Sequence, residues 1–197
     1  MRRTCTTRLS APIVFCDTGP LISILQSHSL GFFVTLFGAV HTTSTCMAEL
    51  SAHGWDHDLA QAADAIVVHR VTGAENQKAQ EYAERIAGHA LTRTRDASHH
   101  LGEAEVIALA HQEGSALLLV DELAARAVAA EAGLTISGFA GVLLWAVEAG
   151  LLSARELKER LEACRRQGTH YSESFIQRIY EAAQEYAGDE GEKSRGA

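Results

Sequence analysis

Ile13-Val14-Phe15-Cys16-Asp17-Thr18-Gly19-Pro20 is a short apolar run that stops at an acid and a turn. A continuous apolar run bounded by turn residues predicts a strand that is buried on both faces, as in a parallel sheet. Ala116-Leu117-Leu118-Leu119-Val120-Asp121 repeats this arrangement, again with an acid directly after the apolar residues. In open α/β sheets, ligands bind at the edge formed by the carboxyl ends of the strands. We therefore expect Asp17 and Asp121 to lie close together if the two strands are neighbours.

Predicted strands alternate with predicted helices along the chain. Strands are expected at 12–17, 40–43, 66–71, 116–121 and 134–137. Helices are expected at 21–26, 32–37, 44–53, 60–65, 75–89, 101–110, 123–132, 141–149, 153–164 and 171–186. This βαβ pattern predicts an α/β fold with a parallel sheet between two layers of helices.

Composition limits the size of the protein and the kinds of partner it attracts. The chain has 197 residues, of which 47% are hydrophobic, enough for one sizeable core. Its formal net charge of -8 does not attract nucleic acid, so a polyanionic substrate needs a local basic rim or a bound metal. The four cysteines are scattered, which favours reduced thiols and a cytoplasmic protein. The most apolar segment, 138–152, is too short to span a bilayer, so no membrane is expected.

Two further acids are expected near the edge that carries Asp17 and Asp121. Glu49 and Glu103 each lie near the start of a predicted helix, and helices that follow parallel strands begin at this edge. Helical spacing places Glu103 on the core-facing side and turns Glu105 toward solvent. Carboxylates that crowd together repel one another unless a cation lies between them, and oxygen ligands alone favour Mg²⁺ or Mn²⁺.

Four segments in this order resemble a PIN domain, of the bacterial and archaeal group related to the toxin ribonucleases of toxin–antitoxin pairs. They are Asp17-Thr18-Gly19-Pro20-Leu21-Ile22, Met47-Ala48-Glu49-Leu50, Leu101-Gly102-Glu103-Ala104-Glu105 and Leu119-Val120-Asp121-Glu122-Leu123-Ala124-Ala125-Arg126. The resemblance covers residues 12–150, and the later stretch 157–180 resembles the tail of the same group. It implies a three-layer α/β/α sandwich at 12–150 and a helical extension packed on it at 151–186. The small, charged residues 187–197 predict a disordered tail.

The resemblance also implies a metal-dependent endoribonuclease that cleaves single-stranded RNA, and it allows a role as the toxin of a toxin–antitoxin pair. Asp17, Glu49, Glu103 and Asp121 correspond to the acidic quartet that holds Mg²⁺ or Mn²⁺, with Glu122 as an alternative fourth ligand. Thr18 is expected to orient Asp17 or to contact a phosphate. An antitoxin protein and a second copy of the chain, in a homodimer, are the expected protein partners.

Several residues allow two interpretations. Arg126 is placed to reach a phosphate or to pair with a carboxylate of the site. His99 and His100 precede the Glu103 motif, and either contact RNA or belong to an ordinary polar loop. Asp17 also suits a helix cap, and Glu103 also suits the positive end of a helix dipole. Glu49, considered alone, also suits a solvated helix face.

Two other functions compete with the nuclease. A PIN-fold protein that binds nucleic acid or a partner without turnover would retain the acids for metal binding alone. An aspartyl-phosphate enzyme or a receiver domain also carries an Asp at a strand end. That class is disfavoured because Gly19 stands where a covalent phosphatase needs a second Asp, and because no Lys follows at a later strand end.

Overall fold

The computed structural model describes residues 12–114 and 116–193, and its centre is a parallel sheet of five strands. The strands are β1 (Val14–Cys16), β2 (Val40–Thr43), β3 (Ile66–His69), β4 (Leu117–Leu119) and β5 (Thr135–Ser137). Their order in the sheet is β3-β2-β1-β4-β5. The five strands expected from the sequence are confirmed. β2 has the expected bounds, and the other four strands are shorter than expected.

The two strands that end in acids are neighbours at the centre of the sheet. Val14 pairs with Leu117 and Cys16 with Leu119, and the backbone N–H of Asp17 donates to the Leu119 carbonyl at 3.0 Å. The chain therefore leaves β1 toward one side of the sheet and β4 toward the other. Such a reversal point opens a crevice at the carboxyl edge. Asp17 and Asp121 follow the two strands at this crevice.

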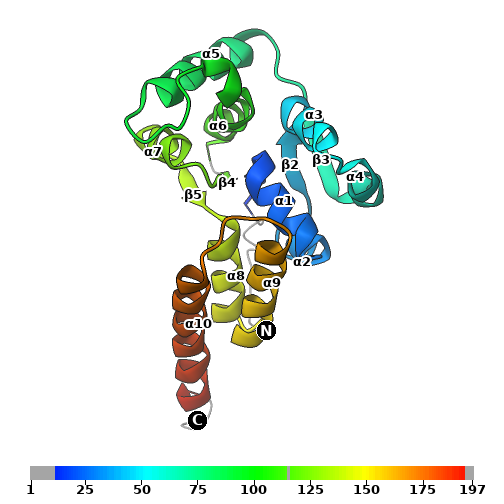
Figure 1. Ribbon diagram of the computed structural model, residues 1–197, viewed down its shortest axis with the longest axis vertical. Helices are drawn as coiled ribbons and strands as arrows, with labels where there is room; N and C mark the ends of the chain where they lie inside the picture. Colours follow the sequence, from blue (N-terminus) through cyan, green and yellow to red (C-terminus); the bar gives the residue numbers. More distant parts are fainter. Residues whose placement is uncertain (1–11, 115, 194–197) are drawn as a thin grey trace, which may run out of the picture.

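The helices cover both faces of the sheet. In chain order they are α1 (Thr18–Gln26), α2 (Leu30–Phe37), α3 (Ser44–Ala52), α4 (Asp56–Ala62), α5 (Gly73–Gly88), α6 (Leu101–Glu113), α7 (Leu123–Glu131), α8 (Phe139–Glu148), α9 (Ala154–Arg166) and α10 (Glu173–Lys193). Two short 3₁₀ turns, η1 (Ala63–Ala65) and η2 (Ala97–His100), lie among them. Figure 1 shows α5, α6 and α7 together on one side and α8, α9 and α10 gathered on the other.

Alternating side chains of the central strands divide the core into two layers. Val14 and Cys16 face a cluster built from α1, α2, α8, α9 and α10, whereas Phe15 faces a cluster built from α5, α6 and α7. Because successive strand residues point to opposite faces, a fully apolar strand supplies both layers. The three-layer α/β/α sandwich with a parallel sheet is confirmed.

The two C-terminal helices complete the layer that covers α1. Leu157 and Leu161 of α9 and Ile176 of α10 are buried in the same cluster as Leu21 of α1. The side chains of Gln26 and Gln167 each donate to the other's backbone carbonyl, at 3.1 and 2.7 Å. The extension therefore shares one core with the residues before it.

Several helix bounds and the direction of one side chain differ from the sequence-based expectations. Helix α1 begins at Thr18, three residues earlier than expected, so Asp17 is its first flanking residue. Glu105 does not point to solvent, because it is half-buried and accepts a hydrogen bond from Thr45 of α3 at 2.9 Å. Helix α10 continues to Lys193, through the first part of the predicted disordered tail, and residues 194–197 lie outside the described residues.

Among the helices of the described segments, none is by itself long and apolar enough to cross a membrane. Helices α1 and α2 together reach the required length and composition, but they are bent by 117° relative to each other.

Candidate active site

A pocket of about 490 Å³ lies at the carboxyl edge of the sheet, beside the ends of β1 and β4. Its walls contain all four predicted ligands together with the alternative ligand Glu122. They are lined by Asp17, Thr18, Gly19, Glu49, His53, Ser98, His99, Glu103, Asp121 and Glu122. The residues come from the strand ends, from α1, α3 and α6, and from the η2 turn. Acids that are distant in the sequence therefore share one cavity.

Asp17 lies at the base of the pocket and is only 6% exposed. It occupies the N-cap position of α1, but its side chain makes no capping hydrogen bond to the described residues. The thiol of Cys46 instead lies 3.7 Å from Oδ1 of Asp17, and Thr43 Oγ1 donates to that sulfur at 3.4 Å. The carboxylate is thus directed to the pocket and does not cap the start of α1.

Glu49 projects from α3 and is held by Thr18. Thr18 Oγ1 donates to Oε2 of Glu49 at 2.6 Å, so this hydroxyl orients Glu49 and not Asp17. Gly102 makes room for the same carboxylate. A Cβ atom at Gly102 would lie 3.1 Å from Oε1 of Glu49 and 3.3 Å from the sulfur of Cys46.

Glu103 stands in the first turn of α6, and its side chain is 17% exposed. The two histidines that precede α6, His99 and His100, differ in their exposure to solvent. His99 is exposed at the mouth of the pocket, whereas His100 is buried, with only 3% of its surface accessible. His100 Nδ1 lies 4.0 Å from Oε1 of Glu103. Of the two, His99 is therefore placed to meet a substrate, and His100 lies behind the pocket wall.

Asp121 and Glu122 form the opposite wall. The Asp121 carboxylate rests against Gly138, where an added Cβ would lie 2.7 Å from Oδ1. Glu122 caps α7 by accepting the backbone N–H of Ala125 at 2.6 Å. Arg126 donates to the backbone carbonyl of Val120 at 2.8 Å, so its guanidinium stays close to Asp121 without lining the pocket.

The crowding of carboxylates changes their proton affinities. Burial, reinforced by the negative charge of Glu103, raises the pKa of Asp17 well above its usual value. Burial also raises the pKa of Glu103. Burial of its carboxyl raises the pKa of Asp121 to about 6 against the opposing charge of Arg126, although the residue as a whole is exposed to solvent. The pocket therefore favours whatever brings positive charge to it, a proton or a cation.

The kind of donor suits a hard divalent cation, since every acid of the pocket offers oxygen. Within residues 12–114 and 116–193, however, no three His, Cys, Asp or Glu side chains are placed to share one ion. Mutual repulsion is expected to keep such carboxylates apart when no cation is bound. The donor set thus fits Mg²⁺ or Mn²⁺ in kind, and metal binding here is a matter for proposal and test.

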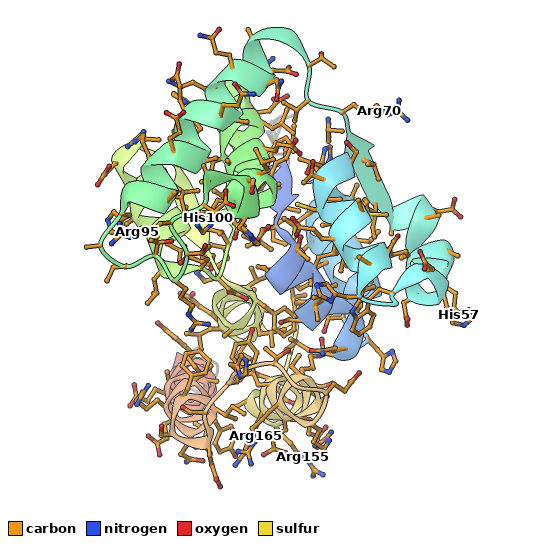
Figure 2. The ribbon with its side chains drawn as sticks, turned by 45° about the horizontal axis from the view of Figure 1, so that its top comes forward. His57, Arg70, Arg95, His100, Arg155 and Arg165 are labelled. Atoms are coloured by element: carbon orange, nitrogen blue, oxygen red, sulfur yellow. The ribbon has the colours of Figure 1, made fainter. Side chains whose placement is uncertain are left out.

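Positive charge is dispersed over the molecule. Arg70, Arg95 and the pair Arg155 and Arg165 lie in three separate regions of Figure 2. Arg95 donates to three backbone carbonyls at the end of α5, at 3.1–3.3 Å, and so ends that helix. The lining of the pocket that the structure describes has no Lys or Arg, only imidazoles.

Some residues of the pocket did not stand out in the sequence. Cys46 carried no motif, and its role depends on a contact between α3 and the end of β1. Ser98 gave no signal. His53 lines the pocket, whereas His57, four residues later, contacts Gln61 at 2.8 Å outside it. The four-residue spacing of the two histidines could not reveal this separation.

A family model described as a PIN domain matches residues 13–185 of the chain. No curated protein and no solved structure matches it. The matched range includes every residue that lines the pocket and both C-terminal helices as far as residue 185.

Proposed function

Because the chain belongs to the PIN domain family, whose members are generally nucleases, we propose that it is a metal-dependent endoribonuclease. The observation that supports this most strongly is the pocket itself. It gathers four acids from four separate stretches of the sequence at the carboxyl edge of the sheet. Carboxylates so crowded destabilise the fold unless they bind something positive.

The proposed ligands of Mg²⁺ or Mn²⁺ are Asp17, Glu49, Glu103 and Asp121, with Glu122 as an alternative to Asp121. Divalent ions are general cofactors of this family. When bound, such an ion acidifies a water molecule and offsets the charge that develops on a phosphodiester.

The remaining residues of the pocket orient these ligands or meet the substrate. Thr18 fixes one oxygen of Glu49, and the thiol of Cys46 supports Asp17. At the mouth, the imidazoles of His99 and His53 offer hydrogen-bond donors to phosphate and ribose oxygens. With no Lys or Arg in the described lining, we propose that the cation supplies most of the local attraction for RNA. Single-stranded RNA is the proposed substrate.

One observation favours a second candidate, a PIN-fold protein that binds nucleic acid or a partner without cleaving. In the described residues, no three ligand groups converge on one point. A site that binds a cation weakly would serve recognition and not turnover. Multiple turnovers by the purified protein would eliminate this candidate.

The first experiment is thermal unfolding of the wild type and of Asp17→Asn, in EDTA and in Mn²⁺. A ligand at 100 times its Kd stabilises the native state by about 2.7 kcal/mol. For a chain of this size that corresponds to a rise of about 5–10 °C in Tm. We expect the rise in the wild type and in Asp64→Asn, an exposed acid on η1 outside the pocket, but not in Asp17→Asn.

Cleavage of single-stranded RNA is the second measurement. We expect cleavage that requires Mg²⁺ or Mn²⁺ and that Asp17→Asn reduces by at least about 100-fold. Cleavage that persists in excess EDTA would contradict the proposal.

A toxin role, with an antitoxin partner and a homodimeric state, stays a prediction drawn from the resemblance. Expression of the wild type and of Asp17→Asn in a bacterial host separates toxicity due to cleavage from toxicity due to binding.

A further inference from the structure

His100 is buried in the wall behind the pocket. It ends the η2 turn, immediately before α6, and only 3% of its surface is accessible. Figure 2 shows it on the same side of the molecule as Arg95, whose loop leads into this turn. A buried imidazole needs a partner for each ring nitrogen, because an unsatisfied polar atom in the interior costs about 1–3 kcal/mol.

The contacts of Nε2 settle which atom carries a proton there. Nε2 lies 3.1 Å from the backbone carbonyl of Thr94 and 3.1 Å from Oγ1 of Thr92. A carbonyl can only accept, and the Thr92 hydroxyl already donates its own proton to the same carbonyl at 2.8 Å. Both neighbours are therefore acceptors, and Nε2 carries the hydrogen that they share.

The other nitrogen, Nδ1, is buried and finds no hydrogen-bond partner among the described residues. Oε1 of Glu103 is 4.0 Å from it. The two side chains come from the N-cap and the third position of α6, three residues apart, where helical geometry places them on the same side. A bare lone pair on Nδ1 would face a carboxylate, which is electrostatically unfavourable. A proton on Nδ1 turns the same approach into an attraction.

We propose that His100 is a positioning residue for Glu103: its Nδ1–H donates to Oε1 and holds this carboxylate toward the pocket. A small movement of the Glu103 side chain closes the 4.0 Å gap to a hydrogen bond. Nε2–H remains bound to the Thr94 carbonyl. Oε2 of Glu103 is left for the cation. The expected effect on metal binding rests on the proposed function, but the contact between His100 and Glu103 does not.

Two substitutions separate this role from a merely structural one. The amide nitrogen of Asn is two bonds from Cβ, as Nδ1 is, whereas the amide nitrogen of Gln is three bonds away, as Nε2 is. His100→Asn keeps a donor for Glu103 and loses the bond to Thr94. His100→Gln keeps the bond to Thr94 and loses the donor for Glu103. A residue that only anchors its loop would tolerate Gln better than Asn.

The first measurement is Mn²⁺ binding, by calorimetry and by the rise in Tm, for the wild type and both variants. Hydrogen-bond partners of metal ligands typically contribute about 10–100-fold to affinity. We expect His100→Gln to weaken binding by about 10-fold and His100→Asn to stay within about 3-fold of the wild type. His57→Gln, at an exposed histidine outside the pocket, is the matched control and should bind as the wild type does. Equal affinities for all variants, or weaker binding by Asn than by Gln, would overturn the proposal.

The second measurement works without metal and keeps the two proposals distinguishable. Chemical unfolding in EDTA of His100→Gln, Glu103→Gln and the double variant forms a double-mutant cycle. If the pair interacts, His100→Gln lowers the unfolding midpoint clearly less in the Glu103→Gln background than in the wild type. Equal shifts in both backgrounds would overturn the positioning role. Coupling in this cycle with no Mn²⁺ response in the wild type would instead defeat the proposed function and leave the contact standing.

Discussion

At the scale of single residues, the candidate site depends on two glycines that let carboxylates approach the backbone. Gly102 is the second residue of α6, and alanine is preferred to glycine in helices by up to about 1 kcal/mol. Its place is nevertheless crowded, because Glu49 and Cys46 occupy the space that a side chain would need. Gly138 gives Asp121 the same kind of access on the opposite wall. Glycine at these positions serves the approach of an acid and not a turn.

Gly102→Ala tests this interpretation. The added methyl group would press on the Glu49 carboxylate at 3.1 Å, so we expect the Mn²⁺-induced rise in Tm to fall by half or more. In EDTA, the stability should change by less than about 1 kcal/mol, because helix propensity offsets the crowding. Thermal unfolding with and without Mn²⁺ measures both effects.

Gly88→Ala is the control for that substitution. Gly88 ends α5, and an added Cβ would have no neighbour within 4 Å. We expect an unchanged or slightly raised Tm and a full response to Mn²⁺. An equal loss of the response in both variants would show that the space beside Glu49 is not what matters.

The sequence allowed the acids of the pocket to be predicted, but not the side chains that hold them in place. Asp17 and Asp121 could be predicted to meet because each follows a fully apolar strand, a pattern that is local and specific. The pairing of Thr18 with Glu49 could not, since it joins two helices whose relative position depends on the whole core. The prediction that Glu105 points to solvent was wrong. Helical periodicity gives the direction of its side chain but does not show that α3 packs on that side of α6.

At the scale of elements, the C-terminal half of α1 is held by the segment that joins the C-terminal helices α9 and α10. Gln26 bonds with Gln167 and with Thr169, while Ser23 lies 3.3 Å from the hydroxyl of Tyr171. Helix α1 carries Asp17 and Thr18 at its other end, so the loop between α9 and α10 helps to fix the pocket without lining it. The sequence predicted the existence and order of these helices but not this attachment, which runs through polar side chains with no periodic pattern.

Leu161→Ala tests the contribution of α9 to the common core. Leu161 is fully buried in the cluster that includes Leu21 of α1. Removing a buried leucine typically costs about 2–5 kcal/mol, which lowers Tm by about 5–15 °C at this chain length. Leu151→Ala, at a leucine that is 53% exposed, should change Tm by less than about 2 °C. Similar Tm values for the two variants would mean that α9 is not part of the core.

At the scale of the whole molecule, part of the negative charge is gathered in one pocket, where burial raises the pKa of several carboxyls. The net charge is -8, and the acids of the pocket add their repulsion within one cavity. The raised pKa values of Asp17, Glu103 and Asp121 mean that the folded state binds protons more tightly than the unfolded state does. This contribution to stability is complete below about pH 4 and is lost as the pH rises through the folded-state pKa values, about 6 for Asp121.

The expected pH dependence is therefore opposite to that of a salt-bridged carboxylate. In EDTA, the Tm of the wild type should fall relative to that of Asp17→Asn as the pH rises from about 4 to 8, because the variant lacks the most buried of the acids. In Mn²⁺, the difference in Tm between the wild type and Asp17→Asn should change less with pH. Thermal unfolding at several pH values provides the measurement, and parallel curves in EDTA would show that the pocket does not strain the fold.

The pairing of β1 with β4 has a consequence during protein synthesis. Strand β1 cannot pair with β4 until Leu117, the partner of Val14, has emerged from the ribosome. Helices α8, α9 and α10, which complete the core, emerge later still. Contacts so distant along the chain cannot form on a nascent polypeptide that is only half made. A ribosome that stalls early on this message would release a fragment without the pocket. If the complete protein cleaves RNA, its own translation is complete before it can do so.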